Sequence, residues 1–228
     1  MDNYSNFNSV NSAGEDSMML AKRQRCHEEG KLYSVLFWMT VVGSPAILVL
    51  SFIGGIIGGI FSVFFSSDVV LYIVLCIIGV ITLALGVTVA VMLLKLGREE
   101  SCFQAAGIAY IVVALSSTIA EFLPDGIFKS VLKIVEVIAA LFYLFEFING
   151  SIHILSGVDN NLAYSWETLK KVYTIIAIVI VVCVVVAFIP VLGVLAALVM
   201  VLAALAALGV LIWEYVLMFK TARALKNF

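Results

Sequence analysis

The sequence predicts an all-α, polytopic integral membrane protein with six transmembrane helices, and three observations lead to it. First, 64% of the 228 residues are hydrophobic, 12% are charged and mean hydropathy is +1.18, whereas soluble domains are about half apolar. Second, six nearly uninterrupted apolar stretches each hold at least about 20 residues, enough to cross about 30 Å of hydrocarbon. Third, Lys and Arg gather in every second gap between these stretches.

Turn-forming residues separate the six predicted spans, as Pro124, Asp125 and Gly126 do between the third and the fourth. The spans cover residues 33–59, 69–94, 102–123, 130–155, 169–189 and 192–219. The apolar runs are too long for β-barrel strands and do not alternate with polar residues. Six consecutive spans with short connections predict three helical hairpins.

The parts of the chain outside the spans are short. Residues 1–21 are polar and aperiodic, so residues 1–31 are predicted to be a disordered cytoplasmic tail that ends in a basic juxtamembrane segment. Residues 32–222 form the six-helix transmembrane domain, and residues 223–228 a cytoplasmic C-terminal end. The first span has no small-residue cleavage site, so we expect it to be retained.

The distribution of cations predicts the orientation. Lys129 and Lys133 border the third and fourth spans, and the other eleven of the thirteen Lys and Arg residues lie in the tail, the second and fourth gaps and the C-terminus. The positive-inside rule then places both termini in the cytoplasm. The expected location is the plasma membrane, or in a bacterium the inner membrane.

Two spans end in similar sequences. Residues 92–98 close the second span and residues 217–223 close the sixth, and both read three apolar residues, Lys, any residue, a small residue and Arg. A repeated helical hairpin would explain this likeness. The tendency of membrane-helix ends to use the same residue types would explain it equally well.

The first span carries a stripe of small residues, namely Ser51, Gly54, Gly55, Gly58 and Gly59. Small residues four apart let a neighbouring helix approach closely. We therefore expect tight helix packing on this face, with an internal neighbour or with another subunit.

The fourth span carries the candidate polar site. Glu146, Asn149 and His153 are three, four and seven residues apart and so lie on one helix face. Because an ionisable residue at the centre of a span costs about 3 kcal/mol, Glu146 should face the interior of the bundle.

Two interpretations of this polar face stay open. It is either a proton- or ion-handling site with His153 as a gate, or a hydrogen-bonded structural group with partners in neighbouring spans. The candidate partners are Ser116, Ser117 and Thr118 of the third span and the neighbourhood of Glu214 on the sixth. Glu214 itself is expected to reach the membrane interface and anchor the helix there.

The sequence contains no catalytic, nucleotide-binding or metal-binding motif, so no cofactor, metal or catalytic residue is predicted. The four cysteines have no metal-site or disulfide spacing. A net charge of −2 without a basic patch argues against nucleic-acid binding.

Two functions fit these features. The first is a non-enzymatic multi-pass membrane protein, a subunit or accessory of a membrane complex, whose partners are the lipid bilayer and other membrane subunits or a second copy of itself. The alternative is a small proton- or ion-coupled transporter or channel that uses the face of Glu146, Asn149 and His153.

Overall fold

A computed structural model describes residues 18–43, 49, 52–53, 56, 69–98, 100–187 and 190–228. The predicted packing residues Ser51, Gly54, Gly55, Gly58 and Gly59 lie outside the described residues, so their packing stays a prediction. The described part of the chain is all-helical, as the sequence predicts.

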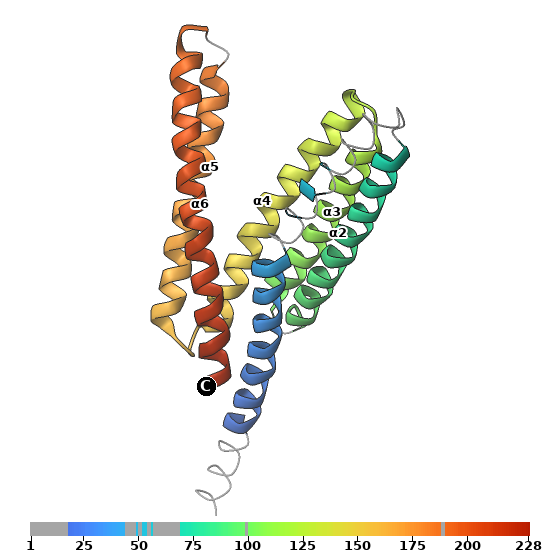
Figure 1. Ribbon diagram of the computed structural model, residues 1–228. Helices are drawn as coiled ribbons and strands as arrows, with labels where there is room; N and C mark the ends of the chain where they lie inside the picture. The colour runs from blue at the N-terminus through green and yellow to red at the C-terminus, as the bar shows by residue number, and fades with distance from the viewer. Residues whose placement is uncertain are drawn as a thin grey trace, which may run out of the picture.

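The described residues form six helices, shown in Figure 1. An N-terminal helix over residues 18–43 precedes α2 (Val69–Leu96), α3 (Ser101–Phe122), α4 (Ile127–Leu155), α5 (Asn160–Ala187) and α6 (Pro190–Asn227). Three segments among them are long and apolar enough to cross a membrane: Cys76–Leu96, Ser101–Glu121 and Ala197–Asn227. Passage of all six helices through the membrane, and the side on which the termini lie, stay predictions.

Local chemistry explains where several helices begin and end. Leu123 has an extended backbone after α3, as expected for a residue before proline. The Asp159 carboxylate accepts a 3.0 Å hydrogen bond from the backbone N–H of Leu162, which caps the start of α5. Pro190 is the first residue of α6, a position where its missing N–H leaves no helical hydrogen bond unmade.

Three helices extend beyond the predicted limits. The N-terminal helix includes residues 18–31 of the segment predicted to be disordered, because Cys26 and Gly30 pack against other helices. The Asp159 cap starts α5 at Asn160, nine residues before the predicted span. α6 continues to Asn227, beyond the predicted span and through most of the segment 223–228, because Ala222 and the other buried residues of its last turns belong to the core.

The helices form two arms that diverge from one end of the molecule (Figure 1). α3 packs against both α2 and α4 in the first arm, and α5 and α6 pair in the second. We call the end where the arms meet the joined end. It comprises the N-terminal helix and residues 89–106, 147–169 and 210–225, which hold most of the buried side chains.

Aromatic rings fill the centre of the joined end. Phe147 of α4 lies with its ring centroid 5.8 Å from Tyr33, 5.9 Å from Phe103 and 5.8 Å from Trp166. These four residues come from the N-terminal helix, α3, α4 and α5, and all are fully buried. One aromatic cluster therefore connects helices of both arms.

Two glycines allow backbones to approach closely at the joined end. A Cβ atom on Gly150 of α4 would lie 2.9 Å from ring atoms of Phe103, and one on Gly30 would lie 2.9 Å from the backbone nitrogen of Lys226. Contacts this short exclude a larger side chain unless the neighbour moves. The N-terminal helix thus packs directly against the end of α6.

Candidate functional site

The three polar residues predicted to form a site all lie on the second half of α4, in the last three turns before the joined end. Asn149 and Glu146 are partly buried and His153 is exposed. Each of them contacts a different part of the chain.

Asn149 connects the two arms. Its side-chain oxygen accepts a 2.8 Å hydrogen bond from the ammonium group of Lys170 on α5. Hydrogen bonds to a charged donor are stronger than neutral ones. Asn149 therefore links α4 of the first arm to α5 of the second.

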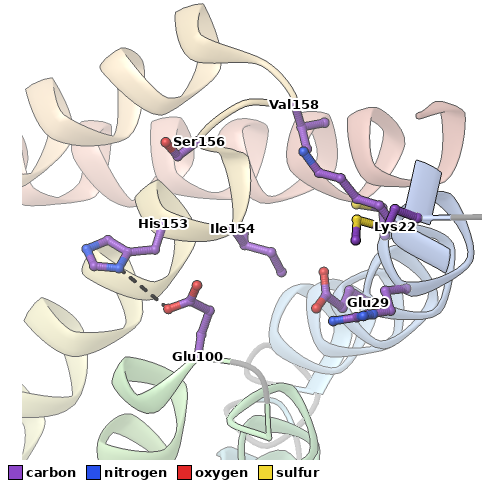
Figure 2. Close-up of a pocket in the computed structure, with 10 residues that line it drawn as sticks. Lys22, Glu29, Glu100, His153, Ile154, Ser156 and Val158 are labelled. Carbon is purple, nitrogen blue, oxygen red and sulfur yellow. Dashed lines mark ion pairs between the residues drawn. The ribbon is translucent and has the colours of Figure 1, made fainter. Parts of the chain in front are cut away.

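His153 contacts the start of α3. Its Nδ1 lies 3.5 Å from a carboxylate oxygen of Glu100, the residue just before α3, as the dashed line in Figure 2 shows. The His153 side chain is 58% exposed and the Glu100 side chain 31%, so this is a solvent-accessible pair that is ionic only when His153 is protonated. His153 is also in the last turn of α4, where the helix dipole stabilises a positive charge.

Glu146 lies against α3. Its carboxylate lies close to the thiol of Cys102 in the first turn of that helix. The hydroxyl of Thr118, one candidate partner from the sequence, lies towards the other end of α3 and donates to the backbone oxygen of Ala114 within that helix. Glu146 is thus in contact with its own chain, but not through the hydroxyl residues that the sequence suggested.

The three residues share a helix face, but they contact three different parts of the described chain. Asn149 binds α5, His153 binds the loop before α3, and Glu146 contacts α3 itself. What they have in common is that each connects α4 to another helix. This arrangement supplies packing specificity, whereas a pathway for ions needs polar groups that line one continuous space.

A more deeply buried polar pair lies between α5 and α6. The Tyr173 hydroxyl donates a 2.6 Å hydrogen bond to the carboxylate of Glu214, which is only 8% exposed. Glu214 therefore does not extend to the interface as the sequence suggested, because Tyr173 provides a partner inside the protein. A carboxylate within an apolar run, such as Glu214, indicates a buried polar residue, but the sequence does not identify its partner, which is 41 residues away.

Two further buried hydrogen bonds hold the joined end together. The indole Nε1–H of Trp166 donates to the hydroxyl of Thr221 at 2.9 Å, joining α5 to α6. The hydroxyls of Tyr33 and Ser151 lie 2.6 Å apart, and Ser151 donates its own proton to the backbone oxygen of Phe147. Tyr33 is therefore the donor to Ser151, because a serine hydroxyl has one proton. Sequence reasoning did not single out these two pairs.

A groove of about 480 Å³ opens beside His153, between the N-terminal helix and the ends of α3 and α4 (Figure 2). Lys22 and Arg25 contribute positive charges to its lining, and Glu29 and Glu100 contribute negative ones. The charges balance, so the groove has no strong preference for an anion or a cation.

A second groove, of about 520 Å³, lies between α3 and α4 and has an apolar lining of alanine, valine, isoleucine and phenylalanine side chains. No group of three or more His, Cys, Asp or Glu residues that could hold a metal ion occurs among the described residues. All four cysteines are free thiols, and burial raises the pKa of Cys26, which makes its thiolate less available for chemistry.

The arrangement on α4 and in the joined end thus consists of hydrogen bonds and close contacts between helices. No protein-family model, no curated protein and no solved structure matches this chain significantly.

Proposed function

We propose that this protein is a non-enzymatic, multi-pass subunit or accessory of a membrane complex, and that the two arms hold segments of a partner. The observation that carries the proposal is the sparse packing of the arms. In α6 only 11% of the most apolar stretch is buried, and in the membrane-spanning parts of α2 and α3 only 28%. A helix that finds so few contacts in its own chain has surface available for other transmembrane helices.

The pairing of the polar residues supports the same function. Asn149, His153 and Glu214 each have a partner within the chain. The apolar groove between α3 and α4 has no charged residue in its lining. A packing subunit needs only satisfied polar groups and accessible apolar faces, whereas a transporter needs a polar cavity at membrane depth.

The proposal includes six spans in three hairpins, with the joined end on the cytoplasmic side of the plasma membrane. The Lys and Arg distribution supports it, since Lys22, Lys95 and Arg223 belong to the segments of the joined end and Lys129 is in the first turn of α4, at the opposite end of that helix. Reporter fusions after Phe228 and in the turn before α6 should report opposite sides of the membrane. The same side in both fusions would contradict the topology.

Site-specific photocrosslinking tests the complex. Phe128 and Phe142, 76% and 51% exposed on the arm half of α4, are each replaced by a photoreactive phenylalanine analogue in cells that express the full chain. Tyr164, which is 65% exposed at the start of α5, is the matched control because it is also aromatic but lies at the joined end. We expect both arm positions, and not Tyr164, to form an adduct with the same membrane protein. Adducts with lipid alone would contradict the proposal.

The alternative function is a small proton- or ion-coupled transporter or channel that uses Glu146, Asn149 and His153. One observation favours it, namely that Glu146 is a carboxylate only partly buried on α4, the helix from which the arms diverge. In proteoliposomes, Glu146→Gln should then abolish a proton- or ion-dependent flux while the protein keeps its fold. No flux in the unaltered protein would exclude this alternative. A structural role predicts that Gln is silent while Glu146→Leu leaves its hydrogen-bonding partner unsatisfied.

A further inference from the structure

A small cationic pocket lies at the end of α6, away from the groove of Figure 2 and from the polar face of α4. Its volume is about 290 Å³, and it is lined by Lys220, Arg223, Ala224 and Asn227 of α6 together with Asp159 and Leu162 at the start of α5. The pocket is too small for a folded segment of another protein, but it has room for the phosphate and glycerol of a lipid headgroup.

The two cations of this pocket are available for a ligand. Among the described residues, neither Lys220 nor Arg223 forms an ion pair, and both side chains are exposed. Asp159, the acidic residue of the lining, accepts the capping hydrogen bond from the backbone N–H of Leu162, so one of its oxygens is occupied. The Asn227 amide adds a neutral donor. The pocket therefore offers two cations and an amide to an anionic group.

An exposed apolar stripe on α6 leads to this pocket. Leu205, Ile212, Val216 and Phe219 are 60%, 64%, 45% and 49% exposed. Their spacing of seven, four and three residues places them on one face of the helix, and Arg223 follows on the same face one turn after Phe219. A hydrocarbon surface that ends in two cations matches the shape of a phospholipid, with an acyl chain along the helix and a phosphate at its end.

We propose that Lys220 and Arg223, with Asn227, form a binding site for the phosphate of an anionic phospholipid whose acyl chain lies along the exposed stripe of α6. Arg and Lys donate charge-assisted hydrogen bonds to phosphate oxygens, and these are stronger than neutral hydrogen bonds. Basic pockets at the ends of transmembrane helices retain anionic headgroups against exchange with neutral lipid. The headgroup pocket lies in the joined end, apart from the arm segments that are proposed to hold the partner.

Native mass spectrometry of the full-length protein released from phosphatidylcholine nanodiscs tests the site. Phosphatidylglycerol is titrated against phosphatidylcholine, and the unaltered protein should bind phosphatidylglycerol roughly 10- to 30-fold more tightly, as two lipid-facing cations imply. The double variant Lys220→Gln with Arg223→Gln should lose most of this preference. An unaltered preference in the double variant would overturn the proposal.

Lys95→Gln with Arg98→Gln is the matched control, because these two exposed cations end α2 with the same spacing and the same charge loss. It should keep the preference for phosphatidylglycerol, and an equal loss in both double variants would overturn the specific site. Lys220→Arg with Arg223→Lys should also keep the preference, which separates charge recognition from a folding defect. If inorganic phosphate alone displaces phosphatidylglycerol at millimolar concentration, the site recognises free phosphate and the lipid proposal fails.

Discussion

Phe103 and Trp166 in the joined end are fully buried, whereas Ile134 of α4 and Leu202 of α6 in the arms are 60% and 57% exposed. Both regions consist of long apolar helices, so hydropathy does not distinguish them. What differs is the chemistry of the contacts. The joined end contains close contacts at glycines, a cluster of aromatic rings and paired polar side chains, and the arm part of α6 consists mainly of Leu, Val and Ala.

The physical reason is that lipid solvates apolar side chains about as well as protein does. Without a hydrophobic driving force, helices in a membrane associate through close packing and interhelical hydrogen bonds. Gly150 provides the close approach, and Trp166 and Thr221 provide a hydrogen bond. The comparison teaches that in this protein specific helix contacts are concentrated at one end, while the arms keep exposed apolar faces.

The largest expected effect comes from Gly150→Ala in the joined end. The new methyl group would lie 2.9 Å from the buried ring of Phe103, so we expect a loss of about 1–3 kcal/mol in the free energy of unfolding through overpacking. Gly209→Ala in α6 is the control, because a Cβ there meets nothing within 4 Å among the described residues. Denaturation in mixed micelles measures the free energy of unfolding of both variants. Equal stabilities of the two variants would break the distinction between the regions.

A smaller effect is expected from Trp166→Phe. This change removes the indole N–H and leaves the buried hydroxyl of Thr221 without its 2.9 Å partner, at a cost of about 1–2 kcal/mol in the free energy of unfolding. Trp38→Phe is the matched change at a side chain that is 57% exposed and should alter stability little. A destabilisation by Trp38→Phe as large as that by Trp166→Phe would show that the hydrogen bond is not the cause.

The smallest effect is expected at the far end of the first arm, where Lys129 donates a 2.8 Å hydrogen bond to Asp125. This hydrogen bond and the charge of Lys129 hold the pKa of Asp125 below its usual 3.8. Because the pKa is lower in the folded state, the stabilisation is present above that usual value and is lost as the pH falls through the lowered one. The melting temperatures of the unaltered protein and of Asp125→Asn should therefore differ slightly at pH 6, and the difference should shrink as the pH falls below 3.8. A difference that grows as the pH falls would contradict the assignment.

The sequence predicted the helical class and the limits of α2, α3 and α4 to within three residues. Those limits follow from local signals, such as Pro124 after α3 and the turn at Gly97 after α2. The helices α5 and α6 run eight or nine residues beyond the predicted spans at one end each. Hydropathy ends a span at the first polar residues, but the Asp159 cap and the buried last turns of α6 continue the helices into the joined end.

The candidate site could be predicted only as a set of residues on one helix face. Asn149 and His153 do lie together on α4, but their partners Lys170 and Glu100 come from other helices, and helix pairing is not encoded in the periodicity of a single segment. The prediction that the Glu214 side chain reaches the membrane interface failed for the same reason. An apolar run with one carboxylate looks the same whether that carboxylate reaches water or a tyrosine on the next helix.

The length of α6 has a mechanical consequence. From Glu214, near the joined end, to Pro190 the helix rises about 36 Å at 1.5 Å per residue. In this stretch its close neighbour within the described chain is α5, so the hairpin can rotate as a rigid lever about the contacts at its base. A tilt of about 10° there would move its tip by about 6 Å, roughly one helical turn. A slight shift at the end of α6 would thereby be transmitted to the far tip of the hairpin.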